Sequence, residues 1–342
     1  MNPRWTRRPE GSTWGDFGPD DERGRLNLLT PQKVLQGVAE VREGLTFCLS
    51  LPLDLPGGNI LNARRHPPRI TPTKRANGKP VTNFLVCEEV DGASDVICDD
   101  LAVIHLQYST QWDSLAHVGC LFDPDGRGAG PTFYNGFRGG RDIVGPSTAE
   151  DANSPSRAKH LGIERLAEAG MQGRAVLIDL RAHLGDARTV VSWEMLRGIL
   201  DADGITVEEG DMVCLHTGFA QRLVEMGGNP DPDLVHSLCA ALDGRDPGIL
   251  DWITRSGLVA LIADNYAVEA YPARPARGEG CAILPLHQHC LFKLGVNLGE
   301  LWHLTPLADW LRAHGRHRFL LTAPPLRLPG AVGSPATPIA TV

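Results

Sequence analysis

The sequence predicts an α/β protein built on a largely buried sheet. Short apolar, β-branched runs alternate along the chain with segments whose apolar residues recur at helical spacing. No repeat of fixed length is visible, and the composition, 42% hydrophobic and 22% charged, is that of a globular chain with a sizeable core. Alternation of this kind is typical of a mostly parallel sheet with helices on its faces.

The first 45 residues are predicted to form an ordered extension that packs on the core. Three aromatic residues anchor it: Trp5, Trp14 and Phe17. Thr30 followed by Pro31 is a typical helix start, with the threonine as the cap and the proline in the first turn. We expect this helix to run from Pro31 to Glu43 and to stop at Gly44.

Residues 46–342 are predicted to form a single domain, since no linker divides them. A strand over 45–51 leads into a long surface loop over 52–79, which is rich in Pro, Gly, Asn and Arg. Further strands are expected at Val96–Leu106, Ala175–Leu180, Met212–His216, Val259–Ala263 and Phe319–Leu321. Helices are expected at Ile163–Ala169, Trp193–Leu200, Leu234–Leu242, Gly248–Ser256, Leu286–Leu294 and Pro306–Ala313.

Charge and cysteine usage exclude several classes of protein. With 33 basic and 41 acidic residues the net charge is −8, which argues against a nucleic-acid surface, and the pair Arg64-Arg65 is interpreted as part of a solvated face. No apolar run reaches the ~20 residues that span a membrane, and no apolar stretch follows the N-terminal charges as in a secretory signal. The eight cysteines form no C-x-x-C pair, so we expect free thiols and a cytoplasmic protein.

Several catalytic motifs are absent. The sequence contains neither a G-x-S-x-G nucleophile elbow nor a G-x-x-x-x-G-K-[ST] phosphate loop. The glycine-rich stretch from Gly126 to Gly130 follows a turn-forming segment and not a strand, so we do not expect it to bind a dinucleotide.

One segment concentrates residues that can coordinate a metal or move a proton. It directly follows the predicted strand Val96–Leu106, and strand ends are where open α/β sheets often place their ligands. Its polar residues are Gln107, Ser109, Thr110, Gln111, Asp113, Ser114 and His117. Carboxylate and amide oxygens suit Mg²⁺ or Mn²⁺, and an imidazole brings Zn²⁺ into range. From the residue types alone, a loop whose polar side chains satisfy its own backbone is an equally good interpretation.

The segment resembles the signature of the cyclase family of metal-dependent hydrolases, which includes kynurenine formamidase, isatin hydrolase and trans-dienelactone hydrolase. The family motif is H-x-G-T-H-x-D-x-P-x-H, and a longer-chain branch carries Gln at the second His. Here the motif positions are held by Gln107, Ser109, Thr110, Gln111, Asp113, Leu115 and His117. Further similarities, in the same order along the chain, lie at Trp14-Gly15, Asp264-Asn265, Val268-Glu269, His287, Leu294 to Glu300 and Pro325 to Pro335.

The resemblance implies a fold and a site. The fold would be a swivelling β/β/α domain with an N-terminal extension and long surface loops, present as a homodimer or homotetramer. The ligands of a divalent ion, Zn²⁺ or Mn²⁺, would be Gln107, Gln111, Asp113 and His287. The acid/base residues would be His117 and Glu300, and the substrate pocket would include Thr110 and Trp112.

The sequence departs from the family pattern at two ligand positions. Gln107 and Gln111 stand where the general motif has histidines, and an amide oxygen binds transition metals more weakly than an imidazole does. Two alternatives therefore stay open. His117 could join the ligand set, leaving proton transfer to Glu300 or His289, or the metal could be absent.

The function implied is hydrolysis of a small cyclic amide, lactone or formamide by metal-activated water. One alternative is an intramolecular cyclase or dehydratase acting on a polyketide-like substrate. Another is a metal-free binding protein of the same fold. In each case the expected partner is a small molecule, with no nucleic acid and no membrane.

Overall fold

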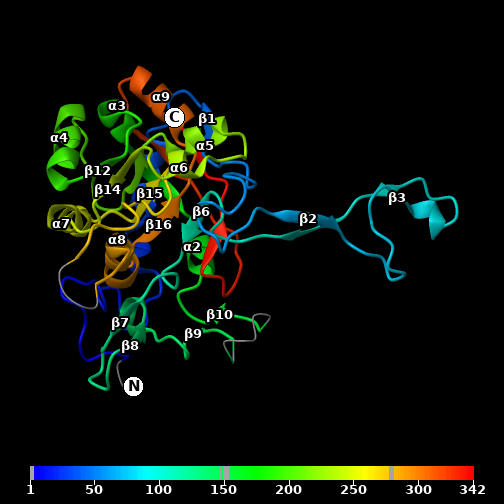
Figure 1. Ribbon diagram of the computed structural model, residues 1–342, viewed down its shortest axis with the longest axis horizontal. Helices are drawn as coiled ribbons and strands as arrows, with labels where there is room; N and C mark the ends of the chain where they lie inside the picture. The colour runs from blue at the N-terminus through cyan, green and yellow to red at the C-terminus, as the bar shows by residue number, and fades with distance from the viewer. Residues whose placement is uncertain (1–3, 147, 149–153, 277–280) are drawn as a thin grey trace.

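The fold is described from a computed structural model, in residues 4–146, 148, 154–276 and 281–342 (Figure 1). A nine-stranded sheet forms its centre, in the order β1-β19-β17-β11-β13-β15-β16-β6-β18. Four neighbouring strands are parallel: β11 (Gln172–Asp179), β13 (Met212–His216), β15 (Ala260–Ala263) and β16 (Asn297–Glu300). The flanking strands are antiparallel: β1 (Thr46–Cys48), β19 (Ile339–Thr341) and β17 (Arg318–Thr322) on one side, β6 (Gln111–Asp113) and β18 (Gly333–Pro335) on the other. The chain is therefore a mixed α/β protein whose sheet curls into a half-barrel.

Both faces of the parallel strands are buried, which explains the continuous apolar runs in β11, β13 and β15. In β11, Val176 and Ile178 belong to the core on one face, and Ala175 and Leu177 to the core on the other. The first core includes α4 (Trp193–Asp203), α7 (Pro247–Ser256) and the π-helix η4 (Gln288–Leu294). The second includes α2 (Glu164–Ala169) and α9 (Thr305–Ala313). These elements confirm five of the six predicted helices, with the helical segment expected at Leu286–Leu294 formed by α8 (Pro285–His287) and η4.

The described part of the N-terminal segment packs on the body, while residues 1–3 lie outside the described residues. Trp14 is fully buried, and its Nε1 donates a hydrogen bond to the carbonyl of Phe292 at 2.7 Å. After η1 (Gly24–Leu28), helix α1 (Pro31–Val38) begins as predicted, with the Thr30 side chain accepting from the Lys33 amide. The helix ends at Val38 and not at Glu43, because the chain turns there toward β1.

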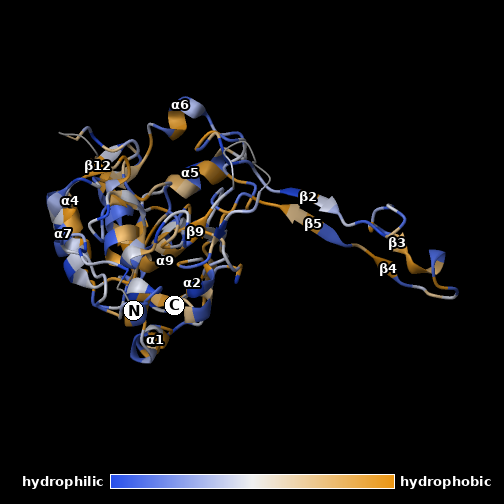
Figure 2. Cartoon of the chain, turned by 90° about the horizontal axis from the view of Figure 1, so that it is seen from below, coloured by the Kyte–Doolittle hydropathy of each residue, from blue (hydrophilic) through white to orange (hydrophobic). Residues whose placement is uncertain are grey.

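A long two-stranded arm projects from the body (Figures 1 and 2). Its inner part pairs β2 (Arg69–Pro72) with β5 (Asp100–Val103), and its outer part pairs β3 (Phe84–Leu85) with β4 (Val96–Ile97), with η2 (Val86–Glu88) near the tip. The predicted strand Val96–Leu106 is thus found in two pieces in the arm and not in the buried sheet. Its apolar residues are exposed, so their apolar character does not come from burial in the core.

One predicted helix, Leu234–Leu242, is wrong. Helix α6 (Pro232–Val235) stops after four residues, and Cys239 takes a left-handed conformation with φ of 60° that no helix continues through. The chain then forms β14 (Ala240–Leu242), which pairs with β12 (Thr189–Val191) outside the main sheet.

The remaining elements are short. They are β7 (Cys120–Phe122), β8 (Gly130–Thr132), η3 (Tyr134–Gly136), β9 (Ile143–Val144), β10 (Arg157–Ala158), α3 (Leu180–Leu184) and α5 (Phe219–Glu225). Within the described ranges, none of the helices combines the length and the apolar character that crossing a membrane requires.

Candidate active site

The short strand β6 lies at the centre of the candidate site. It is held between β16 and β18, so all three of its residues are buried. Alternation along the strand directs Gln111 and Asp113 to one face and Trp112 to the other. Trp112 packs edge-on against Trp302, and its Nε1 donates to the Ala323 carbonyl at 2.8 Å. The sequence placed Trp112 in the substrate pocket, whereas the structure places it in the core behind the site.

Three buried side chains from separate elements meet beside β6. Asp113 comes from β6, Glu300 from β16, and His287 from α8. One potential ligand atom from each lies within 4.8 Å of the others. The Nε2 of His287 is 3.1 Å from Oε1 of Glu300 and 3.9 Å from Oδ2 of Asp113. The structure therefore brings together residues that are 13 and 174 positions apart in the sequence.

The carboxylate of Asp113 is fully buried, and neither of its oxygens has a hydrogen-bond partner among the residues that the structure describes. Burial raises the pKa of Asp113, and the nearby Glu300 carboxylate raises it further, against the lowering effect of the neighbouring histidines. The Gln111 amide donates from Nε2 to Glu300 at 3.0 Å, while its Oε1 is buried without a partner. A buried charge without compensation is costly. Three unpartnered oxygens beside an imidazole are a donor set that fits a divalent cation.

Glu269 fixes the orientation of His287. Its Oε1 accepts from the Nδ1 of His287 at 2.9 Å and from the backbone amide of the same residue at 3.0 Å. Burial lowers the pKa of His287, but the hydrogen bonds and charges of Glu269 and Glu300 outweigh it and raise that pKa to about 10. A carboxylate on Nδ1 that leaves Nε2 facing other ligands is the usual support of a metal-binding histidine. Gly244 makes room for it, because a Cβ there would lie 2.0 Å from Oε2 of Glu269.

His117 stands at the border between the buried cluster and solvent. Its side chain is 21% exposed, and its Nε2 lies 3.8 Å from Oδ1 of Asp113. The Gln107 amide approaches its Nδ1 at 3.5 Å. Gln107 thus lies beside His117, whereas Gln111 contacts Glu300 directly. The two glutamines of the motif have different surroundings, a difference that the sequence did not predict.

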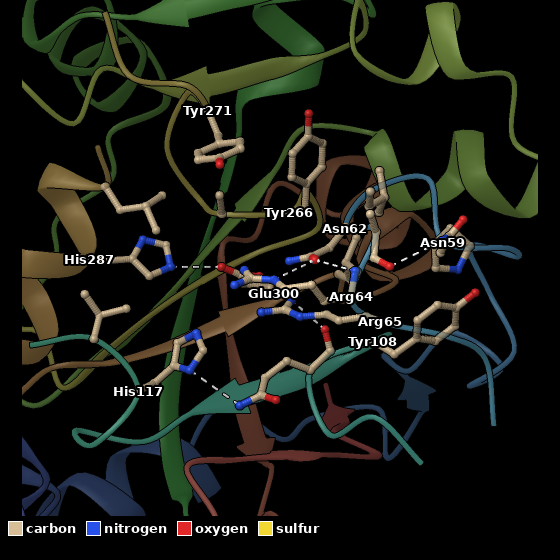
Figure 3. A pocket seen from close by; sticks show the side chains of 18 of the residues that line it. Asn59, Asn62, Arg64, Arg65, Tyr108, His117, Tyr266, Tyr271, His287 and Glu300 are labelled. Carbon is tan, nitrogen blue, oxygen red and sulfur yellow. Dashed lines mark hydrogen bonds and ion pairs between the residues drawn. The ribbon is translucent and has the colours of Figure 1, made fainter. Parts of the chain in front are cut away.

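A cavity of about 640 Å³ opens above this cluster (Figure 3). Residues that the sequence analysis did not assign to the site also line it, among them Arg64, Arg65, Tyr266 and Tyr271. Predicted residues in its wall are Gln107, His117, His287 and Glu300. The Arg64-Arg65 pair, interpreted from the sequence as a solvated face, is instead part of the cavity wall, because the segment before the arm folds back over β6. No pattern in the sequence distinguishes this pair from surface arginines.

Thr110 is buried and does not line the cavity in the described structure. Its hydroxyl donates to the carbonyl of Leu301 at 2.6 Å and accepts from the amide of Leu51 at 2.8 Å. Thr110 therefore links the start of β6 to the segments that carry Leu301 and Leu51. Its role in the structure is to position β6.

The fold and the site together define a class of protein: a mixed α/β chain whose curled sheet carries a buried Asp–His–Glu cluster at the base of a cavity. The model of the Cyclase family matches residues 49–270, and the chain belongs to this family.

Comparisons with solved structures agree with this assignment. The crystal structure of a novel cyclase is 29% identical, with a TM-score of 0.75 and 97% of each chain covered. Isatin hydrolase A from Labrenzia aggregata is 14% identical, with a TM-score of 0.55 over 90% of this chain and 97% of the other. Isatin hydrolase A from Ralstonia solanacearum is 15% identical, with a TM-score of 0.54 over 91% of this chain and 97% of the other. The two isatin hydrolases share the fold. No curated protein matches the chain significantly.

Proposed function

We propose that the protein is a metal-dependent hydrolase that opens a small cyclic amide or lactone, or cleaves a formamide. The observation that carries the proposal is the buried Asp113 carboxylate, which has no hydrogen-bond partner in the described structure although His287 and Glu300 stand beside it. These three residues would hold Zn²⁺ or Mn²⁺, with the unpartnered amide oxygen of Gln111 as a further donor. The swivelling β/β/α arrangement inferred from the resemblance belongs to the same proposal.

The bound ion would supply Lewis-acid activation of the substrate carbonyl and of a water molecule. Proton transfer is the task of His117, which is placed at the cavity wall next to Asp113. The Nε2 of Gln107 lies 3.5 Å from Nδ1 of His117. The proposal requires this amide to turn over, so that its oxygen accepts from Nδ1 and His117 keeps the lone pair of Nε2. The imidazole then accepts the proton of water and returns it to the leaving nitrogen or oxygen. General acid–base catalysis of this kind contributes roughly 10²–10⁴-fold.

Glu300 is assigned to the ligand set and not to proton transfer. Its Oε2 accepts a hydrogen bond from Gln111, and its Oε1 lies 3.1 Å from Nε2 of His287, which would give up its proton when the ion binds. Burial would raise the pKa of Glu300, but the hydrogen bond and charge of His287 outweigh burial and lower it. A carboxylate that stays ionised is a good ligand and a poor acid.

The arginines of the cavity wall suit the product of such a reaction. Hydrolysis breaks the acyl C–N or C–O bond and leaves a carboxylate. Arg64 contacts Oδ1 of Asn62, and Arg65 donates to the carbonyl of Gln107 at 2.7 Å. Both partners are neutral. The charge of Arg65 also acts on the Asp113 and Glu300 carboxylates, but in the described structure it forms no ion pair with them, so both guanidinium groups can meet a carboxylate formed in the cavity.

The test is an assay of metal-stripped protein reconstituted with Zn²⁺ or Mn²⁺. A panel of cyclic amides, lactones and formamides is followed by mass spectrometry. We expect cyclic amides and lactones to give products heavier by one water, and formamides to give formate and an amine lighter by one CO. These products should form only with metal and be absent for Asp113→Asn. Products lighter by one water would instead support the cyclase or dehydratase alternative. A protein that binds panel members but takes up neither metal would support the metal-free binding protein.

A further inference from the structure

The arm lacks the contacts that normally stabilise strands. Among the described residues, β2 pairs only with β5 and β3 only with β4, so each ribbon has two open edges. All four residues of β2 and all four of β5 are exposed. A two-stranded ribbon without a covered face is marginally stable in water, and an open edge is a template for further pairing. The arm is therefore built for a contact that a single chain does not provide.

The arm also exposes an unusual amount of apolar surface. Its exposed large hydrophobic residues are Ile70, Leu85, Val90, Val96, Ile97, Leu101 and Val103. Together they present on the order of 600 Å² of apolar surface, divided between the two faces of the ribbons. Leu101 and Val103 lie on the same face of the inner ribbon, where they are 51% and 47% exposed.

The charges of the arm are segregated between its two limbs. Residues 69–79 carry four basic side chains and no acidic one, and residues 88–100 carry six acidic side chains and no basic one. In the described structure only Arg75 forms ion pairs within the arm, with Glu88 and Glu89. This pattern is complementary to itself. Two arms stacked face to face about a two-fold axis along their length place each charged limb over the opposite one.

We propose that the arm is an assembly device that docks on a second copy of this chain, with the face of Leu101 and Val103 in the interface. The segregated charges support a second copy as the occupant, because stacking brings the basic limb of each arm over the acidic limb of the other. Leu101 and Val103 of both arms would supply the apolar centre of this contact. A specific interface buries roughly 1,200–2,000 Å² in total, so the surface beside the arms would contribute as well.

The test measures the oligomeric state of the full-length protein by sedimentation velocity at micromolar concentration. We expect the wild type to be a dimer or a larger even-numbered oligomer. Leu101→Glu places a charge in the docking face and should dissociate it into monomers. The matched control is Val190→Glu in β12, a site 47% exposed on the side of the body away from the arm, which should leave the assembly intact.

A second variant guards against local misfolding of the ribbon. Replacing residues 69–103 by a short Gly-Ser link removes the arm and should also give monomers, with an unchanged far-UV spectrum of the body. The inference is overturned if the wild type is monomeric, or if either arm variant keeps the wild-type assembly. The oligomeric state tests the role of the arm, and metal content tests the proposed metal site. Because the two are measured independently, failure of one proposal is distinguishable from failure of the other.

Discussion

The unpartnered carboxylate of Asp113 makes a quantitative prediction about metal and stability. A ligand that binds only the folded protein stabilises it by about 2.7 kcal/mol at 100 times its Kd. An unfolding entropy of ~2.1 cal/mol/K per residue amounts to about 0.7 kcal/mol/K for 342 residues, so this binding should raise Tm by about 4 °C. We expect Zn²⁺ or Mn²⁺ to produce such a rise in the metal-stripped wild type and not in Asp113→Asn.

The same substitution has the opposite effect without metal. Asparagine keeps the shape of the side chain but removes a charge that burial and Glu300 disfavour, as the raised pKa of Asp113 indicates. Metal-free Asp113→Asn should therefore melt no lower than metal-free wild type. The assay is calorimetry on stripped protein with and without metal, together with elemental analysis.

Asp264→Asn is the matched control for this experiment. Asp264 is equally buried, but its oxygens accept hydrogen bonds from Thr217 and Gly218 at 2.6–2.7 Å. This variant should melt lower and still respond to metal. The reasoning is refuted if Asp113→Asn retains stoichiometric metal and the full rise in Tm.

Three further predictions concern the support of the site and of the N-terminal segment. Glu269→Gln weakens the acceptor that orients His287 and should reduce metal affinity roughly 10–100-fold, as measured by competition with a chelating dye. Gly244→Ala forces a methyl group onto the Glu269 carboxylate and should lower both Tm and metal affinity, whereas unchanged values would contradict the close contact. Glu22→Gln removes an ion pair with Arg165 at 2.9 Å and should cost about 1–3 kcal/mol in denaturant unfolding. Burial alone would raise the pKa of Glu22, but its hydrogen bonds lower that pKa below 4.5. The stabilisation that Glu22 gives the wild type should therefore be lost as pH falls through the lowered pKa. The variant should show no such loss.

The sequence predicted three of the four parallel strands, because burial on both faces gives β11, β13 and β15 continuous apolar runs. It did not predict β16, whose buried residues include Asn297 and Glu300. Met212–His216 has the same bounds in the prediction and in the structure. The sequence did not predict β6 as a strand, since two of its three residues are polar. Gln111 and Asp113 are buried because β16 and β18 flank them, and such long-range pairing leaves no local pattern.

The residues of the site were predictable to different degrees. The resemblance selected His287 and Glu300, which simple periodicity cannot distinguish from core or surface residues. Arg65 reaches the cavity only because the chain folds back before the arm, so no local signal could have indicated it. In the arm the error was the reverse: the apolar pattern of Val96–Leu106 predicted a buried strand, but the strands β4 and β5 found there are exposed. Apolar β-branched residues are as suitable for an interface as for a core, and a single chain does not distinguish the two uses.

The place where the arm joins the body has a consequence for how this protein can diverge. The chain enters the arm just after Arg65 and returns from it just before Gln107, and the side chain of the first is bonded to the carbonyl of the second. The hinge of the arm and the wall of the cavity are thus the same few residues. On the two proposals above, we expect a substitution of Arg65 to alter both the cavity wall and the base of the arm. Substrate preference and assembly would then change together in this chain.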